Sequence, residues 1–221
     1  MQVGNMHYLK ESDLPKEVRL FPLAGALLLP GSIMPLNIFE PRYLELFDDA
    51  MSNDRIVAMV QPNFLNKANT PVDDLCSVGT LGRIISIAES GDGRYLISLG
   101  GVCRFRLKEE LSVKTPYRIA KITPFMTDIE EKDFEMPEAK VELLQHMRKY
   151  VDDNNIEVDY EDIEQLQVSD LVNLLSGLLP FDQAEKQALL EADFEVRVQT
   201  LIALLEMGFS SGVSDSKQTV Q

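Results

Sequence analysis

The first half of the sequence alternates short apolar runs with turn residues, which is the pattern of a β-rich unit. Four short strands are expected, over residues 19–23, 32–39, 56–60 and 117–122. The first of them contains Pro22. Because proline lacks the N–H that a central strand uses, this strand is predicted at a sheet edge.

The clearest β pattern is a long hairpin. Residues 78–89 and 94–106 have apolar and β-branched side chains at alternate positions, and they flank the turn sequence Ser90-Gly91-Asp92-Gly93. Gly100 and Gly101 interrupt the second arm, which indicates a bulge or a sharp bend. Half a dozen strands that include a bent hairpin predict a small closed or half-closed β-barrel.

One helix is expected within this β-rich half. Pro41 stands where the first turn of a helix tolerates proline. Acidic residues then alternate with four apolar ones, which are Tyr43, Leu44, Phe47 and Met51. The spacing predicts an amphipathic helix with one face on the barrel.

After Met136 the periodicity becomes helical. Four helices are expected, over residues 138–151, 170–179, 182–191 and 194–207. In the first of them one apolar stripe is formed by Val141, Leu144, Met147 and Val151. The sequence therefore predicts an α+β protein in which a helical bundle follows the barrel.

Polar residues mark the ends of these helices. Ser169 is expected to be the N-cap of the second, and Asp193 that of the last. Asp182 with Glu185 three residues later forms a capping-box variant before the third. Gly208 stands where a helix commonly ends in a left-handed residue.

The charge distribution divides the chain near residue 126. The net charge is −15, and residues 126–221 hold 22 acidic and 7 basic residues, so this half carries all of it. We therefore expect a barrel over residues 1–125, a helical bundle over 126–209, and a polar, disordered tail over 210–221. An acidic surface repels phosphate backbones, so DNA is not an expected partner.

Composition also limits where the protein is expected to act. Hydrophobic residues make up 45% of the chain, yet no run approaches the roughly 20 apolar residues of a membrane span. The first ten residues lack the basic and apolar regions of a secretory signal. The two cysteines, Cys76 and Cys103, do not make a disulfide framework. A cytoplasmic protein that binds no membrane is expected.

Catalytic motifs are missing or out of place in the sequence. No lysine follows a glycine, so the Gly-Lys-Ser/Thr core of a phosphate-binding loop is absent. Residues 208–212 match the G-x-S-x-G pattern of a nucleophile elbow, but they follow a predicted helix where the motif needs a strand-to-helix turn. His146 has no second histidine or cysteine at ligand spacing. We therefore expect no catalytic residues, metal or cofactor.

Arginines on the predicted strands allow one alternative. A basic stripe for RNA could be formed by Arg83, Arg94, Arg104, Arg106 and Arg118. Arginines on exposed strand faces are common, however, and residues 1–125 are neutral overall. RNA is therefore the less favoured partner.

A set of ordered motifs resembles the N-terminal domain of Lon proteases. The motifs run in family order from Leu20 to about Met207, and the set is more specific than any one of them. They are Leu20-Phe21-Pro22-Leu23, Leu28-Leu29-Pro30-Gly31, the run 35–43 (PLNIFEPRY), the run 78–84 (VGTLGRI), the hairpin residues 92–95 and 99–105, and Gln187–Glu191 with Asp193 and Arg197.

This resemblance implies a PUA-like β-barrel followed by a helical bundle, in agreement with the periodicity. It implies a non-catalytic module that binds polypeptide substrates or a protein partner, without the ATPase and protease domains of a full-length Lon. Four residues carry the family signature: Phe39, Glu40, Arg42 and Tyr43. They are expected to be structural first, with Phe39 and Tyr43 packing the helix on the barrel, and Glu40 and Arg42 either pairing or satisfying nearby backbone groups.

Two modes of polypeptide binding are considered. The first uses a groove between barrel and helices, and the second uses an exposed barrel edge that accepts an extended peptide as an added strand. Methionines such as Met34, Met51 and Met59 could supply an adaptable apolar surface, although filling gaps in the core is their commoner use. The alternatives are an RNA-binding PUA-like module and an enzyme with a pocket between its two subdomains.

Overall fold

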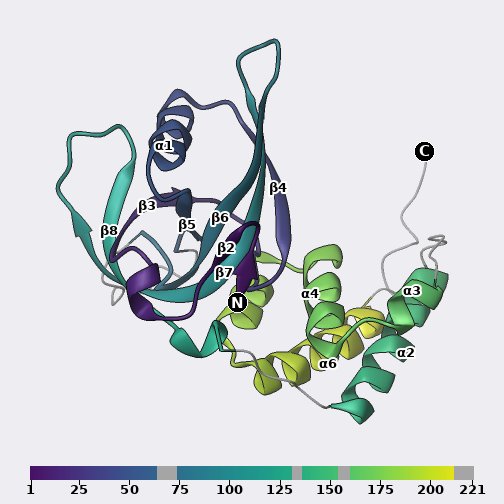
Figure 1. The fold of residues 1–221 in the computed structure, drawn as a ribbon. Helices are drawn as coiled ribbons and strands as arrows, with labels where there is room; N and C mark the ends of the chain where they lie inside the picture. Colours follow the sequence, from purple (N-terminus) through teal and green to yellow (C-terminus); the bar gives the residue numbers. More distant parts are fainter. Residues whose placement is uncertain (64–73, 131–135, 154–159, 212–221) are drawn as a thin grey trace. The chain divides into compact units, whose positions relative to one another are not determined.

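The computed structural model describes residues 1–63, 74–130, 136–153 and 160–211 (Figure 1). The chain divides into two compact units. The barrel unit consists of residues 1–132 and 182–190, and the helical unit consists of residues 133–181 and 191–221. The sequence placed residues 182–191 in the helical bundle, whereas most of them belong to the barrel unit.

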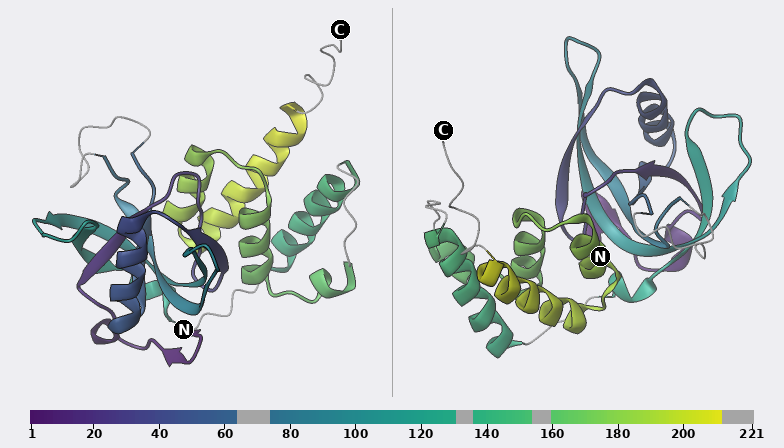
Figure 2. Two further views of the ribbon diagram at one scale, coloured as in Figure 1. Left: turned by 90° about the horizontal axis from the view of Figure 1, so that it is seen from above. Right: turned by 180° about the vertical axis from the view of Figure 1, so that it is seen from behind.

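The barrel unit is built on a six-stranded sheet. Its strands in chain order are β3 (Glu17–Pro22), β4 (Ile33–Ile38), β5 (Ile56–Val60), β6 (Val78–Glu89), β7 (Tyr95–Leu111) and β8 (Arg118–Pro124). The spatial order is β4-β7-β6-β5-β3-β8, and β7 also pairs with β8. This second pairing closes part of the sheet into a barrel, as the curved ribbon in Figure 2 shows. A separate two-stranded sheet joins β1 (Gln2–Val3) and β2 (Met6–His7).

The long strand β7 makes the closure possible. Its first part pairs with β4 and β6, and its last part, from Phe105 onward, pairs with β8. The predicted irregularity lies at Val102, because Leu81 faces Cys103 while the adjacent Gly82 faces Gly101. A bulge of this kind bends a strand and increases its twist. The strand continues to Leu111, five residues beyond its predicted end.

Strand β3 is central, so the prediction of an edge strand was wrong. It lies between β5, with which it runs parallel, and β8, with which it runs antiparallel. Pro22 is compatible with this position because it is the last residue of the strand. The next residue, Leu23, resumes the hydrogen bonding by donating its N–H to the carbonyl of Val60 at 2.9 Å.

Helix α1 (Pro41–Ser52) packs against β3 and β5, on the face of these strands opposite to the barrel core (Figure 1). Its buried face consists of Tyr43, Leu46, Phe47 and Ala50, at i, i+3, i+4 and i+7. This face is rotated from the predicted stripe, since Leu44 and Met51 are only partly buried. The ring of Phe21 on β3 meets Tyr43 edge-on at 4.8 Å and Phe47 at 5.5 Å.

Helix α5 (Gln183–Glu191) is attached to the barrel through polar side chains. The predicted capping box is confirmed, because the N–H of Glu185 donates to Asp182 at 2.8 Å and the N–H of Asp182 donates to Glu185 at 2.7 Å. Gln187 donates to the carbonyl of Val78 at 3.1 Å, and Lys186 donates to that of Gly25 at 2.9 Å. These bonds give side-chain donors to two backbone carbonyls of the barrel unit.

The helical unit contains α2 (Pro137–Asp153), α3 (Tyr160–Glu164), α4 (Val168–Leu178) and α6 (Phe194–Ser211). Its core is formed by apolar side chains of three of these helices, which are Leu143, Met147, Val151, Leu171, Val172, Leu175, Val198, Leu201 and Leu205. No helix among the described residues combines the length and the apolar character that crossing a membrane requires.

Several details of these helices differ from the expectations. Val141, expected on the apolar stripe of α2, is 55% exposed. Ser169 lies inside the first turn of α4, whose N-cap is Gln167. Helix α6 continues through Gly208 to Ser211. The expected tail lies, from residue 212 onward, outside the described residues.

The close packing at the bend gives a first testable prediction. A Cβ atom added to Gly101 would lie 2.1 Å from the backbone oxygen of Leu29, whereas one added to Gly91 at the hairpin tip meets nothing within 4 Å. Gly101→Ala is therefore expected to lower the free energy of unfolding by about 2–3 kcal/mol. Gly91→Ala is expected to change it by less than about 0.5 kcal/mol. Urea denaturation of both variants checks this, and equal stabilities would contradict it.

Candidate binding surface

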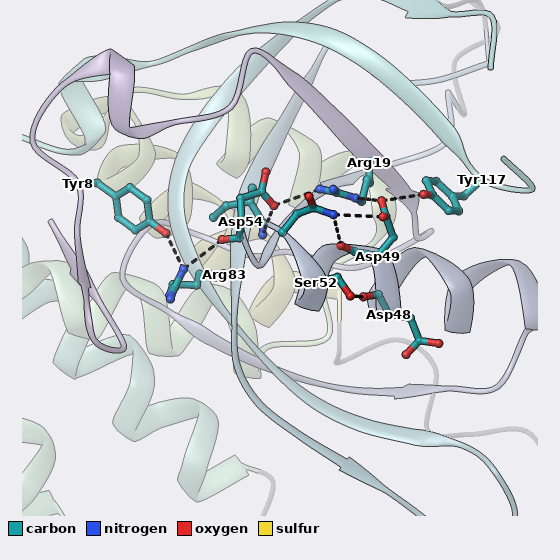
Figure 3. A network of polar contacts seen from close by, with 10 residues as sticks. Tyr8, Arg19, Asp48, Asp49, Ser52, Asp54, Arg83 and Tyr117 are labelled. Carbon is teal, nitrogen blue, oxygen red and sulfur yellow. Dashed lines mark hydrogen bonds and ion pairs between the residues drawn. The ribbon is translucent and has the colours of Figure 1, made fainter. Parts of the chain in front are cut away.

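A polar network joins α1 to the strands around it (Figure 3). Arg19 on β3 donates to Asp49 at 2.6 Å and to Asp54 at 3.1 Å. Tyr117 donates its hydroxyl to the same oxygen of Asp49 at 2.8 Å. Arg83 on β6 donates to the backbone oxygen of Asp54 at 3.2 Å. The end of α1 is thereby tied to β3, to β6 and to the start of β8.

The electrostatics of this network are those of a structural contact. The hydrogen bond from Arg19 lowers the pKa of Asp49, with a further contribution from Tyr117. Burial and the hydrogen bond to Asp49 raise the pKa of Tyr117. A carboxylate held ionised and a tyrosine held protonated are poor proton-transfer groups near neutral pH. The network therefore holds α1 in place and offers no acid–base pair.

A second ionic contact is buried. Arg104 on β7 is 2% exposed, and its guanidinium binds both carboxylate oxygens of Asp128 at 2.9 Å. It also donates to the carbonyl of Leu190 at 3.3 Å and lies over the ring of Phe125. Bidentate geometry together with the additional acceptor satisfies a charge that would otherwise be costly to bury. This contact joins β7 to α5 within the barrel unit.

Three of the five arginines considered for a basic stripe are paired with carboxylates. Arg104 is buried, and Arg118 lies between Asp74 and Glu110, with contacts of 2.8 and 2.6 Å. Arg94 pairs with Asp92 at 2.9 Å. Carboxylates neutralise these three charges, which weakens their attraction for a phosphate backbone.

The four signature residues have different environments. Tyr43 is in the core, and the guanidinium of Arg42 lies 4.5 Å from its ring centroid. Arg42 also pairs with Glu40 at 2.8 Å, as expected, on the exposed start of α1. Phe39 is 61% exposed, which contradicts the expectation that it packs the helix on the barrel. The guanidinium of Arg94 lies 5.8 Å from its ring.

The remaining sequence candidates form no reaction centre. Residues 208–211 of the G-x-S-x-G match are within α6 and Gly212 lies outside the described residues, so no strand precedes the serine. Cys76 and Cys103 are buried, and neither forms a disulfide. Burial raises the pKa of the Cys103 thiol to about 12, aided by the nearby charge of Asp128, so this thiol is a poor nucleophile.

The sheet does present an unusual exposed surface, which we call the outer face. Strand β4 is the last strand in the sheet order, and its register places Met34 and Leu36 beside the core residues Leu99 and Ile97. Side chains alternate along a strand, so the residues between these point to the other side of the sheet. The outer face consists of Ile33, Pro35 and Asn37 on β4, Leu96 and Ser98 on β7, and Ile85, Ser86 and Ala88 on β6.

The residues that define the outer face include no charged side chain, and three of its apolar side chains are exposed. Ile33 is 66% exposed, Leu96 is 52% exposed and Ile85 is 37% exposed. Exposed Phe39 directly follows β4 at the same end as Leu96. Charged residues make up 26% of the sequence, so an uncharged area across three strands is unexpected on a solvated surface. Such a surface is suited to contact with apolar side chains of another chain.

The methionines considered for an adaptable surface pack against the core of the barrel unit. Met59 is 3% exposed, and Met34 and Met51 are partly buried against the same core cluster. Sequence reasoning missed the outer face because its members are separated along the chain and include small polar residues. The alternation of β4 and β7 was visible in the sequence, but which strands lie side by side was not.

Comparison with known proteins identifies a family whose model matches most of the chain. Residues 17–206 match the family model described as the ATP-dependent protease La (LON) substrate-binding domain. Lon protease 2 of Myxococcus xanthus is 23% identical over 201 residues, which cover 89% of this chain and 24% of that protein. Lon protease 2 of Sorangium cellulosum is 28% identical over 199 residues, which cover 85% and 24%. The chain thus spans about a quarter of the length of these curated relatives.

Two solved structures share the fold. The crystal structure of a Lon N-terminal domain protein from Xanthomonas campestris has a TM-score of 0.60 at 24% identity, covering 85% of this chain and 97% of that one. The N-terminal domain of a Lon protease from the Mycobacterium avium complex has a TM-score of 0.63 at 17% identity, covering 86% and 98%. These similarities confirm the predicted α+β fold, with a partly closed barrel and a helical C-terminal part.

The buried ion pair generates a prediction about stability. Asp128→Asn leaves the charge of Arg104 buried without its counter-ion, so we expect a loss of about 3–5 kcal/mol in the free energy of unfolding. The matched control is Lys121→Gln, which breaks an exposed pair with Glu109 in the same unit. This control is expected to cost less than about 1 kcal/mol. Chemical denaturation compares the two, and a similar loss in both would contradict the assignment.

The Asp49 network generates a prediction about pH. Because the pKa of Asp49 is lowered in the folded state, its contribution is present above the ordinary aspartate value, near 3.9, and is lost as the pH falls below it. Asp49→Asn should therefore flatten the decline in stability between about pH 5 and pH 2. Glu45→Gln, on the exposed side of α1, is the control and should retain the wild-type decline. Urea midpoints across this range test the difference.

Proposed function

Because this chain belongs to the family of ATP-dependent protease La (LON) substrate-binding domains, we propose that its outer face binds extended segments of other polypeptides. The observation that carries the proposal is the exposed row of Ile33, Leu96 and Ile85 on a surface without charges. In this role the chain is a non-catalytic binding or adaptor module, and its partners are unfolded or flexible chains.

The chemistry of the surface favours contact through side chains. Burial of exposed apolar area is the main favourable term in most associations between proteins. Each bound apolar residue would cover Ile33 or Leu96 without leaving a buried charge unpaired, since the residues that define the outer face carry none. Small neighbours such as Ser98 and Ala88 leave room for the side chains of a bound segment.

Addition of a full strand to the edge of β4 is less favoured. Pro35 lies in the middle of this strand and has no N–H to donate. An added strand would therefore lack a hydrogen bond at the centre of the edge, which is one way in which proteins protect edge strands from pairing. The proposed mode is docking onto the outer face, with main-chain hydrogen bonds limited to the ends of β4.

A binding measurement tests the proposal. Fluorescence anisotropy of labelled, reduced and carboxymethylated α-lactalbumin, a chain without fixed structure, reports binding to the purified protein. Leu96→Asp and Ile33→Asp place a charge in the outer face and are each expected to weaken binding about tenfold, equivalent to about 1.4 kcal/mol. Both positions are exposed, so the variants should keep the wild-type circular dichroism spectrum.

The matched control is Val113→Asp, which makes the same chemical change at a residue 39% exposed and outside the outer face. It should bind the labelled chain as the wild type does. Equal weakening by Leu96→Asp and Val113→Asp would indicate a general charge effect and would contradict the outer face as the site. Absence of binding by the wild-type protein would contradict the proposed function itself.

A further inference from the structure

The helical unit brings together three side chains that can bind a metal ion. Helix α2 carries Glu142 and His146 one helical turn apart, and α6 carries Glu206. One ligand atom from each residue lies within 4.8 Å of those of the other two. The sequence suggested no ligand partner for His146, because Glu206 is 60 residues further along the chain and comes close only when α2 packs beside α6.

Core packing fixes the backbone at all three positions. Glu142 directly precedes Leu143, His146 directly precedes Met147, and Glu206 directly follows Leu205. These neighbours are between 0% and 4% exposed. The two helices are therefore held together by an apolar seam, and the three ligands lie along its border. Ligands on packed helices keep their spacing better than ligands on loops.

The donor set selects the class of ion. Imidazole nitrogen and carboxylate oxygen bind zinc at about 2.0–2.2 Å, so ligand atoms around one such ion are separated by roughly 3–4 Å. The three ligand atoms lie within 4.8 Å of one another, and their side chains are exposed or half-buried. Small rotations of these side chains would bring the atoms to the separations that one ion requires. Imidazole favours zinc and its transition-metal neighbours, whereas calcium and magnesium prefer oxygen ligands alone.

The charge of the surrounding chain also favours a cation. Residues 126–221 carry 22 acidic and 7 basic residues, and this excess raises the local concentration of cations. The two thiols do not compete for the ion in the folded chain, because Cys76 and Cys103 are buried in the barrel unit. An ion held at the seam would connect α2 to α6.

We infer that Glu142, His146 and Glu206 form a binding site for one divalent transition-metal ion, of the zinc type. Water completes its coordination, since the three residues supply three ligands. The ion stabilises the helical unit by joining two helices that are distant in sequence, and it binds to the folded chain in preference to the unfolded one. This site is independent of the outer face and of polypeptide binding.

Metal titration of the full chain tests the inference. Calorimetry with ZnCl2 should give one ion per chain, and ZnCl2 should raise the melting temperature until a chelator removes it. His146→Gln and Glu206→Gln should each weaken zinc binding at least about tenfold and abolish the thermal shift. CoCl2 as a spectroscopic probe should give a visible absorption band that the same variants lack.

Two control variants make the result specific. His7→Gln removes the other histidine, which is exposed in the barrel unit, and Glu138→Gln removes an exposed carboxylate one turn before Glu142. Both should bind zinc as the wild type does. The inference is overturned if the wild type binds no zinc, if His146→Gln binds it unchanged, or if MgCl2 displaces it at equal concentration, which indicates a non-specific acidic surface. Circular dichroism of each variant verifies that the helical unit remains folded.

Discussion

The structure depends on the bend in β7 at Gly100, Gly101 and Val102. Strand β7 pairs with β4 over residues 95–100, with β6 over 95–106 and with β8 over 105–111, so the bend lies between the segments that pair with β4 and with β8. The bend brings Gly101 so close to the backbone of Leu29 that no side chain fits between them. Closure of the sheet is completed by β8, which pairs with both β3 and β7.

Two ionic contacts then hold helices α1 and α5 against the sheet. Arg19, Asp49 and Tyr117 tie the end of α1 to β3 and to the start of β8, which are neighbours in the sheet. Arg104 and Asp128 occupy the interior near the carbonyl of Leu190, and so connect β7 with α5. Both contacts join segments far apart in sequence. They use charge to specify position within the barrel unit.

The two units differ in the surface they present. The barrel unit has an uncharged area across β4, β7 and β6, suited to apolar segments of other chains. The acidic helical unit has a border of carboxylates and one imidazole along the α2–α6 seam, suited to a cation. A substrate-binding family provides the context for the first surface, whereas the second rests on the arrangement of its own side chains.

The sequence by itself determined the local structure and much of the fold. Alternation predicted the hairpin of β6 and β7, the glycine pair predicted the bend, and Asp182 with Glu185 predicted the start of α5, because these signals act between residues close in the chain. The motifs from Leu20 to Met207 indicated the family. Only the tertiary structure decided that β3 is central, that α5 belongs to the barrel unit, that Arg104 is buried and Phe39 exposed, and that Glu206 meets His146. Each of these depends on which surfaces face one another after folding, and periodicity along one segment carries no information about the segment that will cover it.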